Sequence, residues 1–333
     1  SSAAAKILHS GYFLCRHERI ACLHRRKAGV MEIILIKQVL VMFLLMAVGF
    51  ALHKQGLFSP TCAKDLGAIL VKLVIPVVII QSFLSVPAYE MLQEIAQGAV
   101  LSAIAMLVAL VVSSILFGRR LCVEKFASFT CNAGFVGIPL VSAVFGSHLV
   151  LHIGILIALN NLAQWTYGVF ALTNDLQSIR PKKVLLGPGV LSIAIGFLLV
   201  FLRVPIPDFF QTTLGQLSNL SAPLSMLLLG NYLAQTKPAS FIGKRSLWYA
   251  VLCRLIVIPL ATLWIFALLP VGDATLKMAI LLAASTPVGA NIVVFTSEFC
   301  GEYETSTQSV CLSTLLSVVT LPVFFAFAWK VIG

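Results

Sequence analysis

Ten apolar segments, each close to twenty residues long, occupy most of this chain and constrain its fold more than any other feature. About twenty apolar residues are what a helix needs to cross the hydrocarbon core of a bilayer. Only 11% of the residues are charged and 59% are hydrophobic, whereas soluble domains carry roughly 25% charged residues. The sequence therefore predicts an all-α polytopic membrane protein. The predicted spans are 33–52, 65–84, 95–118, 126–144, 149–172, 185–202, 213–235, 246–269, 276–297 and 306–329.

The fourth span is apolar but interrupted. Its middle holds Asn132, Gly134, Gly137 and Pro139 within eight residues. A broken backbone in hydrocarbon leaves N–H and C=O groups unpaired, at a cost of several kcal/mol each, unless the break is buried in protein or lines a watery cavity. In transporters such a cavity commonly holds the substrate. The alternative is a proline-kinked helix whose kink serves packing alone.

The two halves of the chain resemble one another. Pro223 follows Pro76 by 147 residues, and Pro287 of the ninth span follows Pro139 by 148. This spacing predicts two five-span repeats, at 31–175 and 184–333. Because five is odd, the second repeat enters the membrane inverted, and interrupted helices at matching positions of inverted repeats indicate a transporter's binding site. A chance match among fourteen prolines is the alternative.

The two interrupted spans are expected to cross where they break, near the middle of the membrane. A helix N-terminus carries about half a positive charge and free N–H groups, which favour anions. An asparagine amide adds a donor and an acceptor without a buried charge. This setting suits a carboxylate, although each asparagine could equally cap the broken backbone. The predicted substrate-binding residues are Asn132, Gly134, Gly137, Pro139, Asn160, Asn161, Pro287, Gly289 and Asn291.

Two cations lie inside apolar runs, Lys72 in span 2 and Arg254 in span 8. Intramembrane ionisable residues indicate function by default, here gating or attraction of an anion. The alternative is that both side chains snorkel to the nearer membrane surface. No carboxylate lies at mid-membrane depth, so a carboxylate proton relay is unsupported. We find no phosphate-binding loop, paired catalytic groups or metal-ligand spacing, and predict no enzyme activity, metal or cofactor.

Loop charge predicts the orientation. Eleven Lys and Arg residues follow spans 1, 3, 5 and 7, whereas only Arg203 lies in the loops after spans 2, 4, 6 and 8. By the positive-inside rule the first set is cytoplasmic, which places both termini of the core outside the plasma (inner) membrane. Residues 1–30 form a basic extension that we exclude from the fold, leaving 31–333 as the membrane domain. The net charge of +11 requires no nucleic-acid partner.

The motif Asn132-Ala-Gly-Phe-Val-Gly-Ile-Pro139-Leu, together with the Pro287 break followed by Phe295 and ten spans in two inverted halves, resembles the auxin efflux carrier family. The resemblance covers about residues 31–333. The bacterial branch, which includes malonate and malate permease-like proteins, is most similar because the loop between spans 5 and 6 is short. The motif in span 4 is fairly specific, whereas the one in span 9 is looser.

This resemblance implies a secondary transporter for small organic anions, such as mono- or dicarboxylates. Spans 1, 2, 6 and 7 would form a scaffold within a homodimer, and spans 3–5 and 8–10 a transport domain that slides across the membrane like an elevator. The asparagine of the span 4 motif lies at the substrate site in such carriers, which implies that role for Asn132. The residues after Pro287 in span 9 depart from the pattern of the plant members, so the assignment of Asn291 to the substrate site rests on the symmetry between the two halves of the chain.

Other functions stay open from the sequence. Sodium-coupled bile acid transporters share the broad architecture, which leaves sodium coupling, proton coupling and uniport as alternatives. A transport-silent membrane sensor or regulatory protein of the same fold would be marked by a large soluble output domain, and residues 31–333 contain none. A channel would conduct without saturation by substrate.

Overall fold

The computed structural model describes residues 29–84, 91–179, 187–202, 206–235 and 244–332. Within these residues six helices are long and apolar enough to cross a membrane, and each overlaps a predicted span. The prediction of an all-α polytopic membrane protein is therefore confirmed. The six helices are Gly29–Lys54, Thr61–Leu84, Ile95–Leu116, Ser147–Thr173, Arg245–Leu268 and Glu304–Ile332. The predicted extension lies outside the described residues, except that the first helix already begins at Gly29.

The other four predicted spans are shorter or interrupted helices. Span 4 comprises α5 (Cys122–Phe129), the π-helical turn η2 (Ala133–Gly137) and α6 (Ile138–Phe145). Span 9 comprises α15 (Ala274–Ala284) and α16 (Ile292–Phe299). Both interruptions lie where the sequence predicts them. Span 6 is α10 (Pro188–Phe201), and span 7 is α11 (Asp208–Asn219) followed by α12 (Ser221–Gln235).

Several of the membrane helices contain a widened π turn, and three of these turns are followed by a proline. In η1, η2 and η7, a proline lies two residues after the turn: Pro76, Pro139 and Pro259. Proline has no N–H and its ring crowds the carbonyl four residues earlier, which favours such a local widening.

The remaining elements are α2 (Pro60–Ile69), η1 (Leu70–Val74), α3 (Ile75–Leu84), α4 (Met91–Leu116), η3 (Ser147–Leu149), α7 (Val150–Ala163), η4 (Gln164–Gly168), α8 (Val169–Thr173), η5 (Leu176–Ser178), α13 (Arg245–Leu252), η7 (Cys253–Val257), α14 (Ile258–Leu268) and α17 (Tyr303–Ile332).

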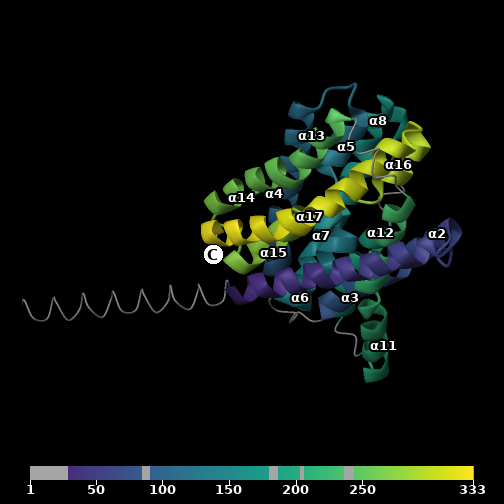
Figure 1. Ribbon diagram of the computed structural model, residues 1–333. Coiled ribbons are helices and arrows are strands. Elements are labelled where there is room, and N and C mark those ends of the chain that lie inside the picture. Colours follow the sequence, from purple (N-terminus) through teal and green to yellow (C-terminus); the bar gives the residue numbers. More distant parts are fainter. Residues whose placement is uncertain (1–28, 85–90, 180–186, 203–205, 236–243, 333) are drawn as a thin grey trace, which may run out of the picture.

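The helices pack in two groups. In the first group, α10 and α11 lie against α3, and α12 lies against α2. In the second group, α4 packs on α5, α7, α14 and α15, and α17 packs on α5 and on α13 to α16. Figure 1 shows α17 running alongside α14, and α11 extending away from the rest of the bundle. The groups meet where α3 and α10 contact α7 and where α12 contacts η2.

Glycines bring the helix Gly29–Lys54 close to α12. A Cβ on Gly49 would collide with the backbone of Leu227, and a Cβ on Gly230 would collide with the carbonyl of Met46. Membrane helices lack a hydrophobic driving force for association in lipid, so small residues that permit close packing largely determine how they contact. These two glycines therefore join the helix Gly29–Lys54 to a helix of the second half of the chain.

Gly230→Ala is expected to lower the free energy of unfolding by about 1–3 kcal/mol, the usual cost of overpacking a close contact. The physical reason is that the new methyl group must displace the backbone of Met46. Reversible unfolding in mixed detergent micelles measures the effect. Gly67→Ala is the matched control, because Gly67 also lies inside a helix and a Cβ there would meet only ordinary contacts, the nearest at 3.9 Å. Equal stability of the two variants would contradict the close contact.

Candidate functional site

The two interrupted spans cross at their breaks. Cys131 and Val288 form an isolated antiparallel β-bridge there. The backbone N–H of Asn132 donates to the carbonyl of Pro287 at 2.9 Å, and that of Gly289 donates to the carbonyl of Thr130 at 3.4 Å. A Cβ on Gly289 would lie 2.9 Å from the carbonyl oxygen of Cys131, so this crossing requires glycine. Each break thus supplies backbone partners for the other, as the hydrocarbon core demands.

Side chains from two further helices pair more of the broken backbone. The amide of Asn160 on α7 donates from Nδ2 to the carbonyl of Cys131 at 3.1 Å, and its Oδ1 accepts from the N–H of Cys131 at 3.5 Å. Ser313 Oγ on α17 accepts from the N–H of Val288 at 3.0 Å. Asn160 and Ser313 therefore both support the broken backbone, and for Asn160 this is the structural role that the sequence left open as an alternative.

Arg254 joins the two helix ends that stop at the crossing. Its Nε donates to the carbonyl of Thr286 at 3.0 Å and its Nη1 to the carbonyl of Phe129 at 3.3 Å. These carbonyls follow α15 and close α5, where the helix dipole is negative and the last C=O groups have no partner inside the helix. The side chain is only 1% exposed, so the alternative that Arg254 snorkels to the surface is wrong. A role in gating or anion attraction stays a prediction.

The other intramembrane cation behaves differently. Lys72 is exposed on the first group of helices, although its neighbour Val71 faces the crossing. The π turn η1 contains both residues, and their position around the helix axis decides which of them points inward. The structure therefore does not bring Lys72 to the crossing.

A cavity of about 70 Å³ lies beside the crossing. Asn132 lines it, is 4% exposed, and has no hydrogen-bond partner for Nδ2 in the part of the chain that the structure describes. The side chain of Asn132 does not cap its own helix. None of the residues that line the cavity in the described ranges is charged. Six of the predicted site residues line it: Asn132, Gly134, Asn160, Asn161, Gly289 and Asn291.

The three other predicted residues lie elsewhere at the crossing. A Cβ on Gly137 would lie 3.3 Å from the Cβ of Ala283, so this glycine allows span 4 to pack on α15. Pro287 contributes its carbonyl to the backbone pairing. Pro139 lines a second, larger cavity instead. Sequence reasoning placed all three with the asparagines because they share the same short motifs.

Several residues of the cavity were not predicted. Cys131 lines it from just before the span 4 motif and Phe135 from within the motif, and Ile75 and Ile157 line it from α3 and α7. Adjacency to Asn132 could have indicated the first two. The isoleucines carry no signal, because an apolar residue in an apolar helix is equally consistent with lipid contact.

Phe295 supports the crossing from behind. Its ring centroid lies 4.6 Å from that of Trp165 and 5.3 Å from that of Phe126. Edge and tilted contacts of this kind are favoured between aromatic rings. Phe295 thus packs α16 against α5 and η4 and fixes the second half of span 9, which explains its place in the sequence motif.

The arrangement at the cavity favours negative charge. The helix Ala133–Phe145 and α16 both begin there. The first N–H groups of α16 donate to the carbonyls of Gly289 and Ala290, just before the helix, so α16 contributes through its dipole rather than through free donors. Each such terminus carries about half a positive charge. Two helices interrupted at a polar cavity, in a bundle with six membrane-length helices, define an integral multi-pass membrane protein with the site architecture of a transporter.

Comparison with known families agrees with this class. The sequence model described as membrane transport protein matches residues 34–184 and 172–325. The chain therefore belongs to this family of membrane transporters, the auxin efflux carrier family, and the resemblance noted from the span 4 motif is confirmed. No curated protein matches the sequence.

Proposed function

We propose that this protein is a secondary transporter that moves small organic anions, such as mono- or dicarboxylates, across the membrane. The observation that carries the proposal is the buried Nδ2 of Asn132, a hydrogen-bond donor without a partner among the described residues that lines an uncharged cavity. A buried polar group without a partner costs about 1–3 kcal/mol. A substrate carboxylate oxygen would accept this hydrogen bond and remove the cost.

Charge supports an anion over a cation or a neutral substrate. Two helix N-termini face the cavity, and the guanidinium of Arg254 lies behind the crossing, bonded to the carbonyls of Phe129 and Thr286. The described residues that line the cavity include no Asp or Glu. The two helix N-termini therefore favour a negative ligand, while Arg254 offsets the negative C-terminal ends of α5 and α15 at the crossing.

Cavity size supports a small substrate and a moving transport domain. A volume of about 70 Å³ accommodates a carboxylate group but is well below the roughly 300–1,000 Å³ of sites that enclose a whole organic ligand. Val71 and Ile75 close the cavity from the first group of helices, and Asn132 and Asn160 line it from the second. Separation of the groups would admit the rest of the substrate.

The proposed architecture has ten spans in two inverted five-helix repeats. Spans 1, 2, 6 and 7 form the scaffold, and spans 3–5 and 8–10 form the transport domain of an elevator-type carrier, which acts as a homodimer. The two packing groups of helices and the crossing of Cys131 with Val288 support this division. Loop charge supports core termini outside the plasma membrane. Coupling to H⁺ or Na⁺, or uniport, is decided by experiment.

Counterflow in proteoliposomes tests the function. Purified protein is reconstituted with unlabelled malonate or malate inside, and uptake of the same radiolabelled acid is followed with and without sodium and with and without a pH gradient. Saturable uptake that requires the internal acid is expected. Dependence on sodium or on the pH gradient identifies the coupling ion.

Two outcomes would overturn the proposal. Binding of acids in a thermal-shift screen without counterflow of any of them would favour a transport-silent sensor of the same fold. Ionic conductance that does not saturate with substrate would favour a channel.

A further inference from the structure

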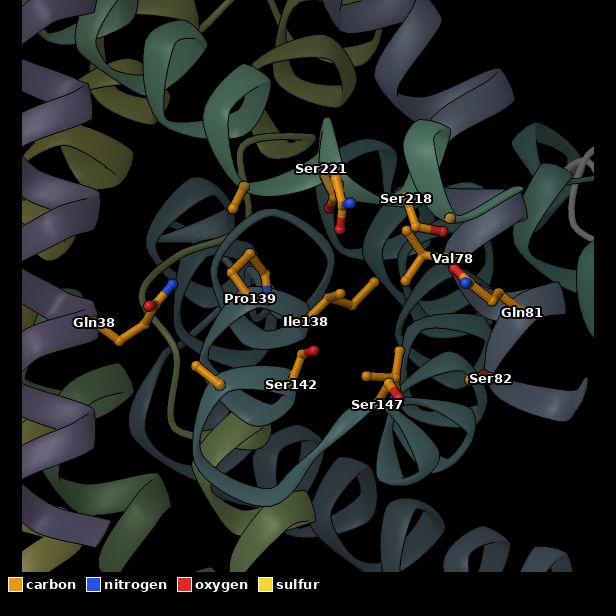
Figure 2. A pocket seen from close by; sticks show the side chains of 15 residues that line it. Gln38, Val78, Gln81, Ser82, Ile138, Pro139, Ser142, Ser147, Ser218 and Ser221 are labelled. Carbon is orange, nitrogen blue, oxygen red and sulfur yellow. The ribbon is translucent and has the colours of Figure 1, made fainter. Parts of the chain in front are cut away.

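A second cavity of about 480 Å³ lies between the two groups of helices. Uncharged polar side chains surround it, and Figure 2 shows several of them around Ile138 and Pro139. Ser221 is 4% exposed, lines the cavity, and has no hydrogen-bond partner for Oγ among the described residues. Hydroxyl and amide groups of this kind can hold water. The polar lining includes Gln38, Gln81, Ser142, Ser147, Ser218 and Ser221.

The two cavities lie on opposite sides of a thin partition. We call the cavity of about 70 Å³ beside the crossing, which Asn132, Asn160, Asn161 and Asn291 line, the amide cavity. On span 2, Ile75 lines the amide cavity and Val78 lines the second one. On span 4, Phe135 lines the amide cavity and Ile138 lines the second one. Three residues of helix correspond to a rise of about 4.5 Å. The partition is therefore about one helical turn thick.

The cavities extend toward opposite ends of the bundle. From the amide cavity the chain of span 4 runs onward to Ser142, which lines the second cavity near the C-terminal end of α6. In the other direction the amide cavity reaches Pro188 and Gly189, at the first turn of α10. Val71 of span 2 lines the amide cavity together with Pro188 and Gly189, whereas Gln81, further along span 2, lines the second cavity. The amide cavity therefore lies toward the beginnings of spans 2 and 6, and the second cavity lies toward the end of span 2.

A close contact holds the partition shut. A Cβ on Gly134 would lie 3.2 Å from Cδ1 of Ile75, so the isoleucine of α3 fits against the glycine of the span 4 motif. One turn further along α3, Ile79 fits in the same way against Gly154 of α7, with a corresponding distance of 3.1 Å. Ile79 lines neither of the two cavities.

We propose that the larger cavity is a water-filled vestibule. It leads from the amide cavity to the membrane face opposite the one toward which the amide cavity itself extends, and the contact between Ile75 and Gly134 is the gate between the two cavities. The proposal rests on the proposed function only in taking the amide cavity as the substrate site. The uncharged lining suits transit, because hydroxyl and amide groups hydrate a carboxylate without the strong attraction of a fixed charge.

Cysteine labelling tests the vestibule. In a background with all eight native cysteines replaced by serine, Ser142→Cys reports on the second cavity and Asn161→Cys on the amide cavity. A membrane-impermeant thiol reagent is applied to intact cells and to inverted vesicles. We expect the two variants to react from opposite faces. Ser147→Cys, which lines the same cavity as Ser142, replaces that variant if it fails to fold. Labelling of both positions from one face, or of neither vestibule cysteine from either face, overturns the proposal.

Ile75→Ala tests the gate. Combined with Asn161→Cys, it is expected to let reagent applied from the vestibule face label the amide cavity about tenfold faster than in Asn161→Cys alone. Ile79→Ala is the matched control, since it removes the same side chain one turn away without lining either cavity. An equal increase in both variants, or none in Ile75→Ala, overturns the gate. Labelling needs no substrate, so these results stand or fall separately from counterflow.

Discussion

Replacing Arg254 by leucine is expected to lower the free energy of unfolding by about 2–6 kcal/mol and to abolish transport. The estimate follows from two buried carbonyls, of Phe129 and Thr286, that lose their donors, at about 1–3 kcal/mol for each unsatisfied group. The same change removes the positive charge that offsets the negative ends of α5 and α15. Both effects act at the crossing, so the cavity beside it should lose its shape.

Arg254→Lys is expected to fall between the native protein and the leucine variant. Lysine keeps the charge, but a single ammonium cannot reproduce the planar fork whose Nε and Nη1 reach different helices. Reversible unfolding in mixed detergent micelles measures stability, and proteoliposome counterflow measures transport.

Lys72→Leu is the matched control for Arg254→Leu. Lys72 is also a cation in an apolar span, but its side chain is exposed and it is not among the described residues that line the cavity at the crossing. Its replacement is expected to change stability by no more than about 0.5 kcal/mol, as for most surface substitutions. Equal effects of the two substitutions would refute the role assigned to Arg254.

The interruptions of spans 4 and 9 could be predicted from the sequence because hydrocarbon leaves few alternatives. Motifs that combine an asparagine, glycines and a proline are not expected in an unbroken, lipid-exposed helix. In span 4 the break lies just before Ala133, and Gly134, Gly137 and Pro139 lie inside the helix Ala133–Phe145 that follows it. The structure interrupts both spans at these motifs. The interruptions are predictable because hydrocarbon does not tolerate unpaired backbone groups, rather than because these residues have low helix propensity.

The division of roles among the polar residues could not be predicted. The resemblance implies a substrate role for Asn132 but assigns none to Asn160, and no residue type shows that Asn160 pairs with both backbone groups of Cys131 whereas Asn132 leaves Nδ2 without a partner among the described residues. Backbone pairing between Cys131 and Val288 involves groups that every residue carries. No residue type therefore marks it.

The contacts of Arg254 and the existence of the second cavity could not be predicted from the sequence for a related reason. Arg254 bonds to carbonyls 32 and 125 residues away in the chain, and only the rotation of its helix distinguishes it from a snorkelling cation. The vestibule is assembled from single polar residues on different helices, such as Gln38, Ser142 and Ser221. Each of them alone is typical of a serine or glutamine that joins two membrane helices.

Asn132→Asp is expected to abolish anion binding while leaving the protein folded. The aspartate has nearly the same shape, and Nδ2 of Asn132 has no partner among the described residues to lose, so packing at the crossing is preserved. The new carboxylate would lie beside the bound anion. At about 4 Å and an effective dielectric constant of about 20, two like charges repel by about 4 kcal/mol, which weakens binding by about a thousandfold.

Asn132→Ala separates the lost hydrogen bond from the repulsion. It removes a donor worth about 1.5–3 kcal/mol to a charged acceptor, so we expect a dissociation constant roughly ten to one hundred times higher, between the native protein and Asn132→Asp. Asn160→Ala is the structural counterpart, because it breaks the pairing with Cys131 and should lower the unfolding midpoint. Calorimetric titration with organic acids and thermal unfolding of all three variants make the test. If Asn132→Asp binds acids as tightly as the native protein, the cavity beside the crossing is not the anion site.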